Sequence, residues 1–201
     1  MKNNIKLRLA NENDYSSILK IYEPYITDTA ITFEYKVPSI SDFSKRLYNI
    51  QKTFPLIVCE IDNIVAGYAY ISRFREREAY DWSTESSIYI NPFYQGKNIG
   101  KALYFALIEL AKLQGYCNIY GVVTMPNFKS EKLHDSFRFT TIGVTHNVGF
   151  KFGKWLDVKW YELNINEYIN QPEKPKLIKE IAGTDEFDLI MENEQNLIMK
   201  K

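Results

Sequence analysis

The spacing of apolar and polar residues in the first third of the chain predicts a short strand followed by two amphipathic helices. Residues 5–9 alternate apolar and charged side chains, which is typical of a half-buried strand. Asn11 and Asn13 are the candidate caps of a helix that follows. The buried stripe of that helix recurs at helical spacing and consists of Ile18, Ile21, Tyr22, Tyr25 and Ile26. Residues 39–53 predict a second helix.

The middle of the chain alternates between strand and helix patterns. Residues 55–60 and 64–71 predict strands that are joined by Asp62-Asn63, a two-residue hairpin signal. The remaining elements are a strand over 84–90, a helix over 100–114 with Gly115 as its C-terminal cap, a strand over 119–124, a short helix over 127–137, and strands over 140–148 and 155–164. This order predicts an α/β (α+β) fold: a mixed sheet flanked by helices on both faces, and not a uniformly parallel sheet.

From residue 166 onward the pattern changes to strongly mixed charge, with two closely spaced prolines. We therefore expect one domain over residues 1–165 and a C-terminal extension over residues 166–201. Two interpretations of the extension stay open: a partly helical tail docked on the body or on a partner subunit, or a solvated flexible segment. The first is favoured by regularly spaced apolar residues, which are Leu189, Ile190, Leu197 and Ile198.

Composition narrows the classes of function. The chain has 201 residues, 25 Lys+Arg and 25 Asp+Glu, so its net charge is zero, which argues against a general binder of nucleic acid or of anionic membranes. No apolar run approaches membrane-spanning length and the N-terminus has no secretory stretch, so we expect a cytoplasmic protein. Cys59 and Cys117 lie in apolar contexts without CxxC spacing, which favours buried, reduced thiols. We expect no metal.

The segment from Glu85 to Gly100 carries the strongest chemical signal. A β-branched strand leads through Pro92 into a loop rich in Gln, Gly, Lys and Asn, and the loop leads into the predicted helix over 100–114. Free backbone N–H groups at such a helix start point outward, and the helix dipole favours negative charge. The pattern predicts an anion site, and the expected anion is the pyrophosphate of a nucleotide-like cofactor.

The loop Gln95-Gly96-Lys97-Asn98-Ile99-Gly100 resembles the acetyl-CoA pyrophosphate loop of the GCN5-related N-acetyltransferases (GNAT family), written Q/R-x-x-G-x-G/A. Pro126-Asn127 and then Lys132-Leu133-His134 follow in that family's order. The resemblance covers about residues 5–164 and narrows to the phosphinothricin and methionine sulfone acetyltransferases. The stretches that narrow it are 29–34 (TAITFE), 67–70 (GYAY), 74–87 (FREREAYDWSTESS) and 148–158 (VGFKFGKWLDV).

The resemblance implies a mostly antiparallel central sheet, acetyl-CoA as co-substrate and a homodimer. It assigns the cofactor to Ile88, Tyr89, Ile90, Gln95, Gly96, Lys97, Asn98, Ile99, Gly100, Lys101, Asn127 and Ser136. The sequence departs from the family at Asn98 and Arg138, which stand where glycines are usual. Asn tolerates a left-handed backbone, so we expect the loop to close, whereas the turn at Arg138 stays open to question.

Acetyl transfer to an amine requires a base, oxyanion stabilisation and a thiolate that can leave. By resemblance, Glu85 is the catalytic carboxylate and His134 the group able to protonate the departing thiolate. A solvated strand-end glutamate and a surface or capping histidine are the structural alternatives. Asp81 is a weaker competitor of Glu85, and we expect it to be a turn residue.

The acceptor site is expected near the arginine-rich segment. Arg73, Arg75 and Arg77 alternate, and a guanidinium suits a carboxylate or phosphinate, although such a pattern also fits a solvated face. Phe33 and Tyr80, together with Ala79, are expected to line the acceptor pocket. The predicted acceptor is a small amino-acid analogue with a tetrahedral side-chain group. Alternatives are a protein N-terminus, a polyamine or an aminoglycoside as acceptor, or a non-catalytic acyl-CoA-binding module.

Overall fold

Seven strands form one sheet in the computed structural model, which describes residues 4–199 of the chain. The strands are β1 (Ile5–Leu9), β2 (Leu56–Ile61), β3 (Ile64–Arg73), β4 (Ser83–Ile90), β5 (Asn118–Thr124), β6 (Thr140–Lys151) and β7 (Lys154–Asn164). The helices are α1 (Tyr15–Thr27), α2 (Ile40–Gln51), α3 (Ile99–Gln114), α4 (Phe128–Ser136), α5 (Ile178–Ile181) and α6 (Asp185–Met199). Three 3-10 turns that the spacing did not predict are η1 (Glu12–Asp14), η2 (Glu78–Tyr80) and η3 (Pro92–Tyr94).

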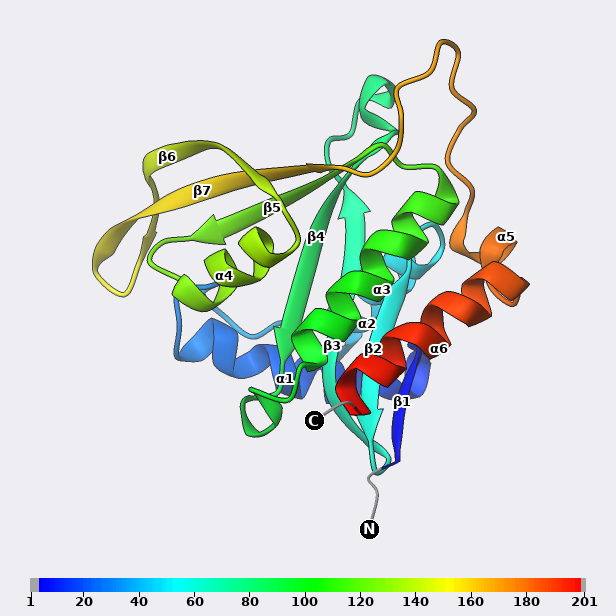
Figure 1. Ribbon diagram of the computed structural model, residues 1–201. Helices are drawn as coiled ribbons and strands as arrows, with labels where there is room; N and C mark the ends of the chain where they lie inside the picture. The colour runs from blue at the N-terminus through cyan, green and yellow to red at the C-terminus, as the bar shows by residue number, and fades with distance from the viewer. Residues whose placement is uncertain (1–3, 200–201) are drawn as a thin grey trace.

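The sheet has the order β1-β2-β3-β4-β5-β7-β6, and only its β4–β5 pair is parallel. That pair is short, because Ser83 to Glu85 are the only β4 residues that face β5, at Asn118 to Tyr120. Beyond Glu85 the two strands diverge (Figure 1). Beyond Glu85, one edge of β4 is therefore left without a neighbouring strand. The predicted mixed, mostly antiparallel sheet is confirmed.

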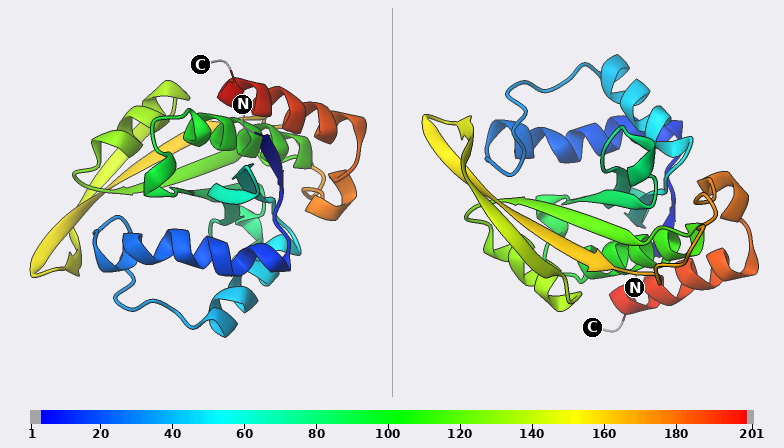
Figure 2. Two further views of the ribbon diagram at one scale, coloured as in Figure 1. Left: turned by 90° about the horizontal axis from the view of Figure 1, so that it is seen from below. Right: turned by 90° about the horizontal axis from the view of Figure 1, so that it is seen from above.

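Helices cover both faces of the sheet, as predicted (Figure 2). α1 and α2 lie on one face, where Ile18, Ile26 and Leu47 are fully or almost fully buried. α3 lies on the other face and buries Leu103 and Leu107 against it. The crossover from β4 through α3 to β5 thus places the start of α3 at the end of β4, beside the unpaired edge.

A hairpin turn and an irregular strand show where local sequence does and does not predict the fold. Asp62 and Asn63 both adopt positive φ, at 50° and 65°, as the predicted two-residue hairpin requires. The prediction that the strand starting at residue 140 ends at 148 was wrong, because β6 continues to Lys151. The register shifts between Thr145 and Gly149, and Asn147 adopts a φ of 52°, so an irregularity interrupts the ladder without ending it.

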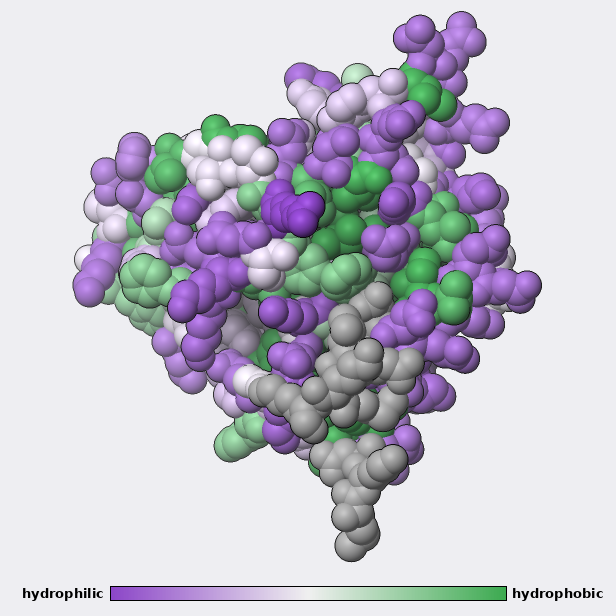
Figure 3. Space-filling model, in the orientation of Figure 1, coloured by the Kyte–Doolittle hydropathy of each residue, from purple (hydrophilic) through white to green (hydrophobic). Residues whose placement is uncertain are grey.

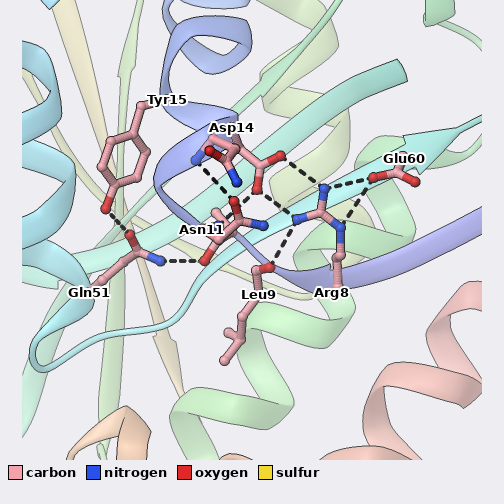
Figure 4. A network of polar contacts seen from close by, with 9 residues as sticks. Arg8, Leu9, Asn11, Asp14, Tyr15, Gln51 and Glu60 are labelled. Carbon is pink, nitrogen blue, oxygen red and sulfur yellow. Dashed lines mark hydrogen bonds and ion pairs between the residues drawn. The ribbon is translucent and has the colours of Figure 1, made fainter. Parts of the chain in front are cut away.

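A polar network joins the start of α1 to β1 and β2 (Figure 4). The Arg8 guanidinium lies 2.6 Å from a carboxylate oxygen of Asp14 and 2.6 Å from one of Glu60. Asn11 caps η1, the 3-10 turn that leads into α1, since its side chain accepts a hydrogen bond from the Asn13 N–H at 3.0 Å. Neither predicted cap is the N-cap of α1 itself, which is Asp14, a residue that makes no side-chain capping hydrogen bond there. The network fixes the entry of the chain into α1.

The C-terminal segment folds onto the body of the same chain. α6 lies along α3 and against β1 (Figure 1). Its buried side chains, together with those of α5, are Ile178, Ile181, Phe187, Met191 and Ile198. The Leu7 N–H on the outer edge of β1 donates to Gln195 Oε1 at 3.2 Å. A side chain of α6 thus provides a hydrogen-bond acceptor for one backbone N–H of this edge strand. Leu189 is 59% exposed, and the Leu197 side chain lies outside the described residues.

Polar residues cover most of the surface in the view of Figure 3, with apolar residues gathered around α3 and α6 and at the β6–β7 end. Large apolar side chains are exposed along the β6–β7 hairpin, namely Ile142, Val144, Val148, Phe150, Phe152 and Trp155. Across residues 4–199, none of the helices has the length and apolar character needed to cross a membrane.

Candidate active site

A cleft of about 980 Å³ lies beside the free edge of β4. Its floor and loop side are formed by predicted cofactor residues: Ile88, Ile90, Gln95, Gly96, Asn98, Ile99, Gly100, Lys101 and Asn127. The opposite walls come from the end of α1, the loop after it and the first turns of α4. The structure thus gathers all but three of the predicted cofactor residues around one cavity.

The loop that precedes α3 has the backbone of an anion site. Gly96 and Asn98 adopt left-handed conformations, with φ of 77° and 60°. Asn98 is the N-cap of α3 but its side chain makes no capping hydrogen bond, so the first N–H groups of α3 are not covered by the cap. The expectation that Asn98 can take the place of the usual glycine is confirmed. Arg138 likewise adopts a φ of 63°, so its turn is closed by a non-glycine residue.

The free edge of β4 presents backbone groups to the cleft. The Ile90 N–H donates to the Tyr25 hydroxyl at 3.3 Å, and that hydroxyl donates to the Ile90 carbonyl oxygen at 2.6 Å. The Ile90 groups therefore point away from β3. Backbone groups in an antiparallel pair alternate in direction, so the N–H and C=O of Ile88 also point to the free edge. An extended, amide-containing ligand could pair with this edge as a strand does.

Three predicted cofactor residues do not place their side chains in the cleft. The Tyr89 ring packs against Tyr22 and Tyr25 on the α1 side, because alternate residues of β4 face opposite ways. Lys97 Nζ lies 4.8 Å from the centre of the Tyr94 ring. Ser136 is exposed at the end of α4, where its hydroxyl donates to the Leu133 carbonyl.

The cleft also contains residues that sequence reasoning missed. Ser130 and Leu133 follow Asn127 on α4, and Lys129 lies beside them. Helical spacing from Asn127 could have found Ser130 and Leu133. Tyr25 was predicted to belong only to a buried stripe, and nothing local in the sequence indicates its contact with Ile90.

Glu85 is the last β4 residue that pairs with β5, opposite Tyr120, before the two strands diverge. Its neighbour Ser86 hydrogen-bonds Tyr104 of α3 at 2.8 Å, so the Glu85 side chain points to the other face of the sheet. Burial raises the pKa of Glu85, and the nearby Arg75 lowers it by a smaller amount. A half-buried carboxylate with a raised pKa at the junction of two strands is suited to accept a proton.

Arg75 is positioned by aromatic rings. Its guanidinium lies 4.2 Å from the centre of the Phe74 ring and 5.7 Å from that of Trp160. Tyr80 contacts Phe74 edge-on at 5.9 Å, and Ala79 precedes it in the exposed turn η2. The structure therefore brings Arg75 to Glu85, with Tyr80 beside the same aromatic platform.

Arg73 lies on the α3 face of the sheet, and Phe33 packs against β6. Arg73 pairs with Thr84 across the strands and forms an ion pair with Asp81 at 2.6 Å on the α3 face, away from Glu85. Phe33 packs on Gly149, where an added Cβ would meet its ring at 2.2 Å. Phe33 thus joins the loop after α1 to β6.

His134 is buried, with 4% of its surface exposed. Its ring stacks on Tyr161 at 4.7 Å and lies directly over Gly121. Nδ1 is 2.8 Å from the Ser130 carbonyl oxygen, which can only accept, so the Nδ1–H tautomer is the one that fits. Burial lowers the pKa of His134, and the hydrogen bond to Ser130 opposes this. The stacking and the hydrogen bond fix the ring, and burial favours its neutral form.

Both cysteines are buried free thiols, as predicted, and burial raises the pKa of each. Within the part of the chain that the structure describes, no three His, Cys, Asp or Glu side chains lie close enough together to hold a metal ion.

Comparison with known proteins identifies the family. Residues 7–160 match the model of the acetyltransferase (GNAT) domain. The chain is 30% identical over 166 residues to the L-methionine sulfoximine/L-methionine sulfone acetyltransferase of Salmonella typhimurium, covering 81% of this chain and 95% of that protein.

Two solved structures extend the match. A GNAT superfamily phosphinothricin acetyltransferase from Sinorhizobium meliloti, in complex with AcCoA, has a TM-score of 0.81 and 31% identity, covering 89% of this chain and 99% of that one. A ribosomal-protein-alanine N-acetyltransferase from Brucella melitensis has a TM-score of 0.77 and 30% identity, covering 79% of this chain and 98% of that one. The chain therefore belongs to the GNAT acetyltransferase family, and it is an N-acetyltransferase.

Proposed function

We propose that this enzyme transfers the acetyl group of acetyl-CoA to the α-amino group of a small amino-acid analogue of the phosphinothricin, methionine sulfone or methionine sulfoximine type. The observation that carries the proposal is the position of Glu85. It lies where β4 and β5 diverge, with Arg75 nearby, while the cleft lies along the other part of β4. Two of the relatives named above, the Salmonella methionine sulfoximine/methionine sulfone acetyltransferase and the Sinorhizobium phosphinothricin acetyltransferase, are named for acceptors of this kind.

The cleft fits the two parts of such a co-substrate. The first N–H groups of α3 and the left-handed loop at Gly96 and Asn98 would bind the pyrophosphate. The outward N–H and C=O of Ile88 would pair with the amides of the pantetheine arm. Bound acetyl-CoA would supply the acetyl group as a thioester at the point where the strands part.

Glu85 has the role of general base in this proposal. An α-amino group is protonated in water near neutral pH, and an ammonium group has no lone pair with which to attack. Glu85 accepts that proton directly or through a water molecule. Its pKa, raised by burial, makes it a stronger base than an exposed glutamate.

Arg75 orients the acceptor. A guanidinium held near the Phe74 and Trp160 rings loses less freedom than a free one when it binds a carboxylate through two parallel hydrogen bonds. A zwitterionic amino acid would then place its carboxylate at Arg75 and its ammonium at Glu85. Arg73, on the other face, has no part in this arrangement.

The role of His134 as the acid that protonates the thiolate stays a prediction. The contacts of the ring support a neutral imidazole that donates through Nδ1 to the Ser130 carbonyl oxygen. We therefore propose that His134 positions α4 beside the cleft. In this tautomer Nε2 carries no proton, so the ring could protonate the thiolate only after first accepting a proton at Nε2.

We also propose a homodimer in the cytoplasm. Support comes from the apolar side chains exposed on the β6–β7 hairpin. β6 is an edge strand, and an edge strand with exposed apolar side chains is suited to pack against a second copy of the chain. Free cysteines fit a reducing compartment. Light scattering that finds a monomer at working concentration would exclude the dimer.

A protein N-terminus is the second candidate acceptor. The Brucella relative favours it, as does the exposure of Arg77, Ala79 and Tyr80 beside the proposed acceptor site. Neutral net charge gives no support to cationic acceptors such as polyamines or aminoglycosides.

One assay separates these acceptors. Thiol release from acetyl-CoA is measured with phosphinothricin, methionine sulfone, methionine sulfoximine, polyamines, an aminoglycoside and N-terminal peptides. We expect selective turnover of the first three. Turnover of peptides alone would move the proposal to the second candidate, and binding of acetyl-CoA without any turnover would indicate a non-catalytic acyl-CoA-binding module.

A further inference from the structure

A side-chain hydrogen bond joins the two sides of the cleft. Lys129 Nζ in the first turn of α4 donates to Gln95 Oε1 in the loop before α3, at 2.8 Å. The Tyr25 hydroxyl, which hydrogen-bonds Ile90, lies on the same cleft as Gln95. Lys129, Gln95 and Tyr25 all line the cleft. A ligand that fills the cleft must therefore meet this connection.

Lys129 is a cation whose hydrogen-bond partner is a neutral amide. Glu131 on the same helix is engaged by Lys159, at 3.1 Å. Among the described residues that line the cleft, Asp28 is the single carboxylate, on the far wall after α1. Lys101, at the start of α3, adds a second positive charge to the same cavity. The charge around the anion loop is therefore positive and suits a phosphorylated ligand.

We propose that Lys129 is a phosphate-binding residue of the cofactor cleft. When coenzyme A enters, Lys129 breaks its hydrogen bond to Gln95 and binds a phosphate at the nucleotide end of the cofactor. The inference rests on the proposed use of acetyl-CoA. A charged donor binds a phosphate oxygen more strongly than it binds an amide oxygen, so the exchange is favourable. Gln95 is adjacent to Gly96 of the anion loop, so a phosphate at that loop lies within reach of Lys129.

Binding of coenzyme A to the full-length protein tests this proposal by isothermal titration calorimetry. Lys129→Met keeps the length of the side chain and removes its charge. We expect about tenfold weaker binding of coenzyme A, because one charge-assisted hydrogen bond is lost. Binding of acetyl-pantetheine, which has no phosphate, should be unchanged. Lys132→Met is the matched control, since Lys132 lies on the same helix outside the cleft lining.

Titration of 3′-dephospho-CoA then distinguishes the two phosphate sources. An equal loss with coenzyme A and with the dephospho form places Lys129 at the diphosphate, and a loss confined to coenzyme A places it at the 3′-phosphate. Two results would overturn the role of Lys129 and leave the proposed function standing. One is unchanged binding of coenzyme A by Lys129→Met, and the other is an equally large loss of acetyl-pantetheine binding. Failure of the unaltered protein to bind coenzyme A would overturn both.

Discussion

Gly121 of β5 is the position where one added methyl group tests the placement of His134. A Cβ there would lie 2.3 Å from Nε2 and 2.7 Å from Cδ2 of His134. The ring cannot move aside freely, because Tyr161 stacks on it at 4.7 Å and Phe139 contacts it edge-on at 5.0 Å. Gly121→Ala must therefore displace either the ring or strand β5.

The expected loss of stability is about 1–3 kcal/mol, which is typical of an added methyl group in a close-packed interior. For a chain of this length that loss lowers Tm by about 2–4 °C for each kcal/mol. Thermal unfolding followed by circular dichroism measures it. Gly143→Ala in β6 is the matched control, because nothing lies within 4 Å of its added Cβ. We expect it to change stability by less than about 1 kcal/mol.

A double-mutant cycle makes the test specific to His134. In a His134→Ala background the clash partner is absent, so Gly121→Ala should be nearly neutral, and the coupling free energy should be about 1–3 kcal/mol. Additive effects, within about 0.5 kcal/mol, would refute the packing of His134 on Gly121. His134 would then have to occupy another position, and its relation to the cleft would change.

Further predictions concern the tail, the acceptor site and acid stability. Phe187→Ala should destabilise the protein by about 3 kcal/mol in urea unfolding, whereas Leu189→Ala on the exposed side of α6 should change stability by less than about 1 kcal/mol; equal, small effects would contradict the docking of α6. Arg75→Met should raise the KM of the acceptor about tenfold and leave that of acetyl-CoA unchanged, and steady-state kinetics with an unaltered acceptor KM would exclude it from the site. Burial tends to raise the pKa of Asp14, but the hydrogen bonds from Arg8 and from a backbone N–H outweigh this and hold the pKa below its ordinary value. This contribution of Asp14 to the free energy of unfolding is fully present above the pKa of Asp14 in the unfolded state, and it is lost as the pH falls through the pKa in the folded state. Urea midpoints measured from about pH 6 down to pH 2 should therefore fall less for Asp14→Asn than for the unaltered protein.

Local features of the chain were enough to predict most of the elements and the cofactor cleft. The segment from Glu85 to Gly100 forms strand, loop and helix start in sequence order, so the backbone expected of an anion site could be predicted from adjacent residues. Asn98 could be placed in a left-handed conformation from its own chemistry. The family resemblance then supplied the expected cofactor.

Side-chain direction beyond the strand ends could not be predicted. Arg73 and Arg75 would share a face if the strand continued, but β3 ends at Arg73. The turn after it directs Arg75 toward Glu85, while Arg73 pairs with Asp81 on the opposite face. The alternation that suggested a common face therefore does not extend through the turn.

Long-range contacts were equally out of reach. Tyr25 has helical spacing with its buried neighbours, yet its hydroxyl binds Ile90, which is 65 residues away in the chain. Packing of α6 depends on the outer edge of β1 and on α3, which become neighbours only in the folded sheet. Both interpretations of the C-terminal segment were therefore consistent with its sequence.

The pH dependence of acetyl transfer by Glu85→Gln shows whether Glu85 is the general base. In the unaltered enzyme, kcat/KM should fall at low pH as Glu85 becomes protonated, at a pKa raised by burial. Glu85→Gln should lower kcat/KM by about 100-fold or more, remove that acidic limb and leave coenzyme A binding intact, while the control Glu109→Gln should behave as the unaltered enzyme. Unchanged turnover and an unchanged acidic limb in Glu85→Gln would contradict the account, because the base would then have to be another group.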